Sequence, residues 1–465
     1  METKMSSGKK RWMLLFLLLL AVSILGLFIE EPPSLFNLDE ETAKLLDKAD
    51  IAWMITATGL VMLMTPGLSF FYGGMVRSKN VISTMIQSVM AMGVISIIWV
   101  VVGFSLAFGD SWYGIIGYPQ TFFMFRNVGA SPLGISGMEL TIPLALFALF
   151  QLKFAIITPA LITGSFAERI HFSGYLIFML LFSVFIYAPL AHWTWHPDGI
   201  LGAMHVKDFA GGIVVHASSG IAALAGAIYL GRRRQQGKYV PANMPMVLLG
   251  ACLLWFGWFG FNGGSSLASN EGAVKAFLNT NTACAAAMMA WVLFDTVRNH
   301  KPSGMGVAVG AVVGLVAITP SAGWVTIGQS MFIGTITAIC CNIAVHWKNQ
   351  SSVDDALDVF PTHGVGGIIG TVFTGIFVEG LLAGEYQYFL NHLIAIAIVF
   401  TYTFVGSYFL YWVTDKLVDL RVSQESERIG LDRSQHGEAY SIIQEDNAPE
   451  LAAPTDPMFG GPELH

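Results

Sequence analysis

Two histidines in this chain stand inside long apolar stretches, where a titratable side chain is rare. His216 follows Asp208 in a run that stops at Arg232, and His363 follows Asp358 in a second run of the same kind. An ionisable group deep in a membrane is costly, faces the protein interior or a cavity, and marks a functional site by default. An imidazole nitrogen donates or accepts a proton near neutral pH. The pair therefore predicts a buried site that handles a proton or a small polar solute.

Other interpretations of these histidines stay open from position alone. Each could be a structural residue that is hydrogen-bonded to a neighbouring helix. A haem or zinc enzyme could also use intramembrane histidines, but such sites need more ligands or histidine pairs spaced along one helix. No third histidine, cysteine or carboxylate of the apolar runs stands at ligand spacing, and the four cysteines form no CxxC pair. The pattern predicts no metal, no cofactor and no enzymatic reaction.

The elements that must position the histidines are membrane helices. The 465 residues are 54% hydrophobic and only 12% charged, and the mean hydropathy is +0.62. Long apolar runs with sparse charge are typical of one all-α polytopic membrane domain rather than several soluble domains. After an N-terminal signal-like segment we expect eleven transmembrane helices, at about 51–74, 81–108, 140–166, 174–195, 209–230, 244–262, 277–297, 305–322, 325–347, 361–380 and 389–415.

The chain divides into five parts along its length. Residues 1–29 carry a basic cluster before an apolar stretch, as in a signal peptide or an uncleaved signal anchor. Residues 30–50 form an acidic segment outside the membrane, 51–415 the membrane domain, 416–440 a cytoplasmic tail, and 441–465 a disordered extension. The excess of basic residues falls on the loops of Arg77, Arg169 and Arg232, which makes that side cytoplasmic. The N-terminus is then outside the inner (plasma) membrane and the C-terminus inside.

An internal repeat relates the first five predicted helices to the next five. Three pairs of stretches match in the same order: Ser69–Gly74 with Phe259–Gly264, Ile157–Pro159 with Ile318–Pro320, and Asp208…His216 with Asp358…His363. Five is an odd number of spans, so the two halves have opposite topology. This is the inverted-repeat plan of transporters, in which the site lies near the midplane between the halves. The eleventh helix stands outside the repeat.

Several motifs together resemble the ammonium transporter family, which includes the Amt, Mep and Rh proteins. The resemblance covers about 48–440 and rests on Phe70–Asn80, Phe150–Phe154, Ile157–Ala160, Phe166–Ile170, Asp208–His216, Gly257–Asn262, Asp358–His363, Gly430–Asp432 and His436–Glu438. It implies a homotrimer of eleven-helix protomers, each with its own narrow hydrophobic pore. It further implies ammonium, ammonia and methylammonium as substrates, lipid around the protein, a PII signalling protein as a possible cytoplasmic partner, and no nucleic acid.

The resemblance also implies a role for individual residues. His216 and His363 match the twin pore histidines, and Phe154 and Phe261 match the two stacked rings that close the outer end of the pore. Asp208 matches a structural carboxylate beneath the outer vestibule. The residues that match the ammonium-binding vestibule are Phe150, Trp195 and Ser265. Lys153 departs from the family pattern, and because it would repel a cation inside the pore, we expect it to point elsewhere.

These residue types suit a dehydrated cation. Aromatic faces attract a cation by roughly 0.5–2 kcal/mol each, and a serine hydroxyl accepts one of the hydrogen bonds of ammonium. Two classes of protein on the same fold remain as alternatives, namely a non-conducting ammonium sensor and a neutral-gas channel for ammonia or carbon dioxide. Trp195 and Ser265 favour a vestibule that recruits a cation, and hence the bacterial Amt type.

Overall fold

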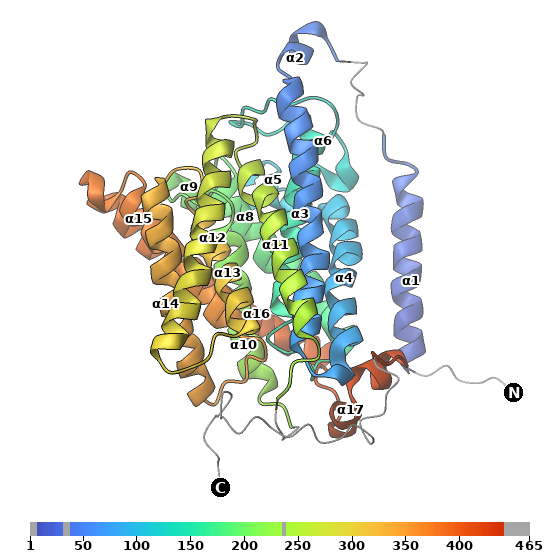
Figure 1. Ribbon diagram of the computed structural model, residues 1–465. Coiled ribbons are helices and arrows are strands. Elements are labelled where there is room, and N and C mark those ends of the chain that lie inside the picture. The colour runs from blue at the N-terminus through green and yellow to red at the C-terminus, as the bar shows by residue number, and fades with distance from the viewer. Residues whose placement is uncertain (1–6, 31–37, 235–238, 441–465) are drawn as a thin grey trace, which may run out of the picture.

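The fold is a bundle of membrane-length helices (Figure 1). The computed structural model describes residues 7–30, 38–234 and 239–440. Within these ranges, ten helices or runs of consecutive helices are long and apolar enough to cross a membrane. They are built from α3 (Lys48–Met75), α4 (Val81–Ile98) with α5 (Phe104–Phe108), α6 (Leu144–Ile162), α7 (Phe172–Phe182) with α8 (Ala188–Trp195) and α9 (Ile200–Ala203), α10 (Ser218–Leu230), α11 (Met244–Gly264), α12 (Glu271–Val297), α14 (Ile327–Gln350), α15 (Gly366–Phe377) and α16 (Tyr386–Leu417).

The predicted segment at 305–322 is the one that falls short of membrane length. It forms α13 (Gly304–Ile318), an apolar helix of 15 residues that is buried almost throughout. The helix ends at Ile318, and its C-cap Thr319, which precedes Pro320, keeps a helical backbone conformation. An all-α polytopic fold is therefore confirmed, whereas the count of eleven spans stays a prediction.

Several spans change their helical form partway along. Five-residue and six-residue π-helices interrupt or precede α-helices at η3 (Trp99–Gly103), η5 (Ser183–Tyr187), η6 (Gly212–Ala217) and η7 (Phe360–Val365). Such π segments occur frequently at functional sites. The histidines of the predicted site lie in two of them, His216 in η6 and His363 in η7.

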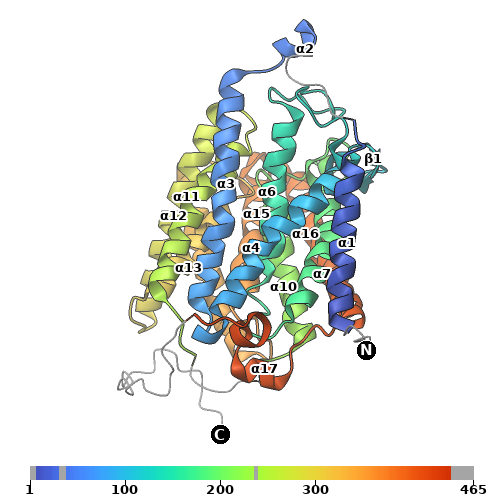
Figure 2. The ribbon, with the colours of Figure 1, turned by 90° about the vertical axis from the view of Figure 1, so that its right-hand side faces the viewer.

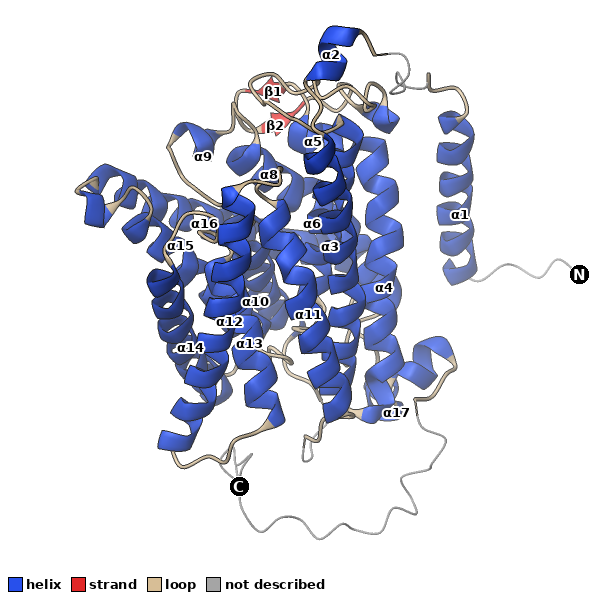
Figure 3. Cartoon of the chain, turned by 45° about the horizontal axis from the view of Figure 1, so that its top comes forward, coloured by secondary structure: helices blue, strands red, loops and turns tan. Residues whose placement is uncertain are grey.

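The remaining short elements lie at the two ends of the bundle. The strands β1 (Ser111–Trp112) and β2 (Ile116–Gly117) form an antiparallel hairpin at the upper end (Figure 3). His192 fixes this hairpin through a contact of 2.8 Å between its Nε2 and the Ser111 Oγ. The other short helices are α2 (Glu40–Lys44), η2 (Ser78–Asn80), η4 (Phe123–Phe125), η8 (Leu381–Ala383), α17 (Gln424–Ile429) and η9 (Asp432–His436).

The basic residues that were predicted to be cytoplasmic gather at the lower end of the bundle. Glu168 is buried and accepts hydrogen bonds from Arg77 and, at 3.1 Å, from Arg233. Arg233 also binds both carboxylate oxygens of Asp354, at 2.8 and 2.9 Å. Bidentate, partly buried pairs of this kind are stronger than exposed surface pairs. This network ties together four loops that are distant in sequence, those of Arg77, Glu168, Arg233 and Asp354.

The tail that follows α16 docks on the same end (Figure 2). The Asp432 carboxylate accepts the backbone N–H groups of Ile82 (3.1 Å) and Ser83 (2.7 Å) at the start of α4. The Arg421 guanidinium donates to the Leu230 carbonyl at the end of α10, and Arg421 forms a β-bridge with Ile170. The tail up to residue 440 is thus held by contacts with three loops, while the predicted extension at 441–465 lies outside the described residues.

The signal-like segment forms α1 (Ser7–Gly26), which runs beside the bundle (Figure 1). Most of its described side chains are exposed, and the Trp12 ring lies 6.5 Å from the Phe172 ring. Its apolar part, Trp12–Gly26, is shorter than a membrane span. Cleavage of the segment stays a prediction.

Two broken helices cross at glycines, and this crossing positions the histidines. η6 leads into α10, and η7 leads into α15. A Cβ added to Gly220 of α10 would lie 2.0 Å from the backbone nitrogen of Gly364 in η7, and one added to Gly367 would lie 2.7 Å from the backbone nitrogen of Ala217. The two backbones therefore touch, as small residues allow between membrane helices.

We expect Gly220→Ala to destabilise the protein by about 3 kcal/mol or more, because its methyl group would overlap the backbone of η7. The matched control is Gly93→Ala in α4, where an added Cβ meets nothing within 4 Å. Thermal unfolding of both purified variants in detergent measures the difference. Equal unfolding midpoints for the two variants would contradict the close crossing.

Candidate functional site: a buried histidine pair in a narrow cavity

The two predicted pore histidines touch each other. His216 Nδ1 lies 3.3 Å from His363 Nδ1, and the ring centroids are 5.4 Å apart at an interplanar angle of 26°. Both side chains are buried. Since a hydrogen bond between two imidazole nitrogens needs one donor, one ring carries the shared proton and the other accepts it. The geometry thus allows a proton to pass from one histidine to the other.

A narrow apolar cavity lies against this pair. Its free space for the centre of a water-sized molecule is about 10 Å³, which is close to the minimum that holds one water. His216 Nε2 is buried and has no hydrogen-bond partner among the described residues. Apart from the two histidines, only hydrophobic side chains line the cavity: Met64, Leu68, Phe71, Ile157, Leu161, Leu254, Trp258, Phe261 and Val312.

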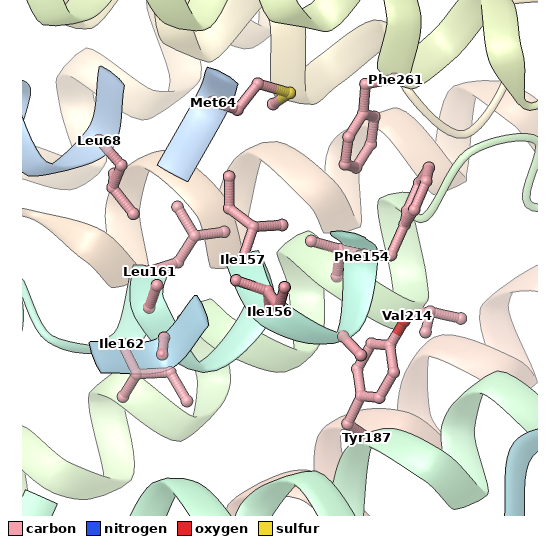
Figure 4. Close-up of a cluster of buried hydrophobic side chains, with 14 of the residues drawn as sticks. Met64, Leu68, Phe154, Ile156, Ile157, Leu161, Ile162, Tyr187, Val214 and Phe261 are labelled. Atoms are coloured by element: carbon pink, nitrogen blue, oxygen red, sulfur yellow. The ribbon is translucent and has the colours of Figure 1, made fainter. Parts of the chain in front are cut away.

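Phe154 of α6 and Phe261 of α11 stack against each other beside the cavity. Their ring centroids are 4.2 Å apart at an interplanar angle of 28°, and both rings are buried (Figure 4). The Phe261 ring is also 5.8 Å from the His216 ring. The structure therefore brings together the two predicted gate residues and places them next to the histidine pair.

The predicted vestibule residues lie around the same phenyl pair. The Phe150 ring is 4.9 Å from the Phe154 ring, and the Trp195 ring meets Phe154 edge-on at 5.8 Å. Ser265 follows α11, and its hydroxyl donates to the Phe261 carbonyl at 2.7 Å. Phe150, Trp195 and Ser265 are distant from one another in sequence, and each contacts one of the two gate residues.

Asp208 holds the start of the helix that carries His216. Its carboxylate accepts the backbone N–H groups of four residues, Gly211, Gly212, Ile213 and Val214, at 2.6–3.2 Å. The negative charge also suits the positive end of the helix dipole. The Asp208 carbonyl accepts the indole N–H of Trp195 at 3.0 Å. Asp208 is therefore placed to fix both His216 and Trp195, in agreement with a structural role.

The corresponding residue in the second half is Asp355, and the predicted match with Asp358 is wrong. Asp355 precedes His363 by the same interval that separates Asp208 from His216, and its buried carboxylate accepts the Phe360 N–H at 2.7 Å. Asp358 instead pairs with the Lys348 ammonium at 2.6 Å. Burial raises the pKa of Asp355 to about 6, although the nearby Lys348 offsets part of the rise. The equal spacing was the sequence signal that could have identified it.

Two further residues complete the description of the site. Trp258, which sequence reasoning did not single out, stacks on His216 at 5.1 Å, and its indole N–H donates to Thr319 Oγ1 at 2.9 Å. Lys153 does not line the cavity. It shares a partly exposed stripe of α6 with Ala145 and Leu149, whereas Phe150 and Phe154 are buried. Lys153 therefore lies outside the lining of the histidine cavity, and its orientation relative to a pore stays a prediction.

No group of three or more His, Cys, Asp or Glu side chains among the described residues could hold a metal ion. The cavity therefore offers an imidazole pair within an aromatic and aliphatic wall, with room for one small molecule. Such a wall rejects a hydrated ion, because removing its water is costly.

A model of the ammonium transporter family matches residues 52–440. The chain belongs to the ammonium transporter family. An ammonium transporter of Aquifex aeolicus is 44% identical over 409 residues, which are 85% of this chain and 94% of the relative. The crystal structure of Candida albicans Mep2 is 32% identical with a TM-score of 0.79, covering 90% of this chain and 96% of that one. A sensor Amt protein is 30% identical with a TM-score of 0.77, covering 83% and 98%.

Membership of this family settles the class of protein. The relatives are ammonium transporters, and the chain is accordingly a multi-pass membrane protein and not an enzyme.

We expect Asp208→Asn to destabilise the protein by roughly 2–3 kcal/mol, because the new amide group leaves two buried N–H groups unsatisfied. The matched control is Asp358→Asn, which removes one partly exposed ion pair with Lys348 and costs about 1 kcal/mol or less. Chemical or thermal unfolding of the two variants compares them. A larger loss for Asp358→Asn would show that the capping carboxylate is not the stronger constraint.

Proposed function

We propose that this protein transports ammonium across the cell membrane through its histidine-lined cavity. The observation that carries the proposal is the direct contact between His216 and His363 beside a cavity that is lined by Phe261, on which the Phe154 ring stacks. A space that admits about one small molecule, with an imidazole pair as its polar wall, suits ammonia and excludes hydrated potassium or sodium.

Recruitment takes place in the vestibule formed by Phe150, Trp195 and Ser265. The two aromatic faces offset part of the cost of dehydrating the cation, by roughly 0.5–2 kcal/mol each. Beyond Phe154 and Phe261, the apolar wall disfavours a bare charge, so ammonium yields a proton as ammonia enters. The free Nε2 of His216 accepts that proton, the shared Nδ1 position passes one on, and His363 releases one toward the lower end.

The wider architecture that we propose follows the inverted repeat. Asp208 with η6 and Asp355 with η7 form matching half-sites, which supports a 5+5 arrangement of spans plus α16. The short α13 counts as the eighth of eleven spans. The helix α1 is a signal peptide or signal anchor. Three copies of the chain form a homotrimer. The basic cluster at the lower end supports a cytoplasmic C-terminus in the inner membrane.

Two alternatives on the same fold call for separate tests. The likeness to a sensor Amt protein favours a sensing role as the second candidate, and the docked tail offers a cytoplasmic surface for a PII signalling protein. A neutral-gas channel would conduct without any need for the aromatic vestibule. Currents and uptake of ammonium and methylammonium in reconstituted vesicles separate a transporter from a non-conducting sensor.

We expect the double variant His216→Ala, His363→Ala to lose selective conduction, because the only imidazole wall of the described cavity is removed. Electrical recording and isotope uptake in vesicles measure the rate for ammonium against potassium. The control is His392→Gln, a buried histidine that bonds the Lys207 N–H and the Tyr388 carbonyl outside the cavity. Wild-type rate and selectivity in the double variant would refute the relay.

We expect Trp195→Leu to weaken the apparent affinity or the rate about tenfold, which corresponds to about 1.4 kcal/mol of lost cation attraction. Trp193→Phe is the control, since the Trp193 indole donates to the Ile115 carbonyl and its ring packs on Tyr402. The concentration dependence of the current reports both variants. An unchanged dependence in Trp195→Leu would remove the vestibule from the mechanism.

A further inference from the structure

An apolar groove opens on the side of the bundle, near the lower end of α14. Its volume is about 540 Å³, which lies in the range of small-molecule sites. Cys340, Ile343, Ala344 and Trp347 of α14 form one wall, and Leu224 of α10 lies across from them. Phe360 and Val365, which flank His363 in η7, also line the groove, as do Lys348, Ser351 and Val353 near its lower end. The groove therefore reaches the helix that carries a pore histidine.

The groove faces the surroundings of the protein rather than its core. The Trp347 side chain is 67% exposed, and α14 is one of the ten membrane-length helices. Tryptophan is enriched at the level where the acyl chains meet the lipid headgroups. The apolar wall therefore lies beside acyl chains, and its lower end lies at headgroup level.

The lower end of the groove carries a cation without a counterion. That cation is Arg232. The other basic residue there, Lys348, is paired, since its ammonium contacts the Asp358 carboxylate at 2.6 Å. Arg232 is different: its guanidinium donates to the carbonyls of Ser351 (2.6 Å) and Ser352 (3.1 Å), and among the described residues no carboxylate pairs with it. Ser351 also lines the groove.

This placement leaves part of the Arg232 guanidinium available to an anion. A guanidinium has five N–H donors in a planar fork, and the two carbonyls of Ser351 and Ser352 use two of them. The remaining donors match the geometry of a phosphate group. Its neighbour Arg233 offers no such capacity, because Glu168 and Asp354 already bind it.

We propose that the groove is a binding site for an anionic glycerophospholipid of the lower leaflet. One acyl chain lies along Ala344, Leu224 and Phe360, and the phosphate binds Arg232. Charge complementarity selects this occupant, since basic pockets between membrane helices on the cytoplasmic side bind anionic headgroups. A bound lipid packs against Phe360 and Val365 and so supports the η7 segment that holds His363. The site does not depend on what the pore conducts.

Lipid binding is tested on the full-length protein, delipidated in detergent and titrated with phosphatidylglycerol or phosphatidylcholine of identical acyl chains. Native mass spectrometry counts the retained lipids, and thermal unfolding measures the stabilisation. We expect the wild type to prefer phosphatidylglycerol about fivefold, because one basic residue contributes about 1 kcal/mol to such binding. Arg232→Gln abolishes that preference, whereas Ala344→Phe fills the groove and lowers the binding of both lipids.

Two matched controls keep the charge and volume changes away from the groove. Arg234→Gln changes a neighbouring exposed arginine, and Met331→Phe enlarges an exposed residue near the other end of α14. Both retain wild-type lipid preference. Equal binding of the two lipids by the wild type overturns the proposal. An undiminished preference for phosphatidylglycerol in Arg232→Gln also overturns it. If Ala344→Phe fails to fold, the result with Arg232→Gln decides the outcome.

A photo-crosslinker at Trp347 identifies the occupant in native membranes. Attachment to a phospholipid supports the site. Attachment to a second copy of the chain shows a protein–protein interface in its place and overturns the proposal.

Discussion

The arrangement of this protein depends on how closely two broken helices can approach. Gly220 and Gly367 let the backbones of α10, η6, η7 and α15 come into contact where any Cβ would overlap its neighbour. Because the backbones touch, His216 and His363 lie within hydrogen-bond reach of each other. Larger residues at the crossing would push the two helices apart, which would weaken or break the hydrogen bond between the imidazoles.

The crossing works only because each half-helix is anchored at its own end. Asp208 binds four N–H groups at the start of η6, and Asp355 binds the start of η7. These carboxylates satisfy the backbone donors that a broken membrane helix would otherwise leave unpaired in an apolar environment. The Arg77–Glu168–Arg233–Asp354 network and the docked tail then fix the loops at the lower end. Anchored ends thus hold the close crossing at the centre.

Around the crossing, aromatic side chains do two different things. Phe154 and Phe261 stack on each other next to His216, whereas Trp258 stacks on the His216 ring itself. Trp195 contacts the Phe154 ring, and its indole N–H also donates to the Asp208 carbonyl. These contacts connect the phenyl pair to the residue whose carboxylate caps the helix of His216.

The sequence alone determined the membrane class, the position of nearly every span and the two histidines. Apolar runs and buried titratable residues are local signals, because a bilayer imposes the same cost on every polar group whatever the fold. The resemblance to a known family supplied Phe154, Phe261 and the vestibule residues, since aromatic residues in a membrane helix otherwise indicate only packing. Tertiary structure decided that Asp355, and not Asp358, matches Asp208, that Trp258 stacks on His216, and that Lys153 lies outside the lining of the cavity. These facts depend on which side of a helix meets which neighbour, and a weak apolar periodicity in helices buried on most sides does not encode that choice.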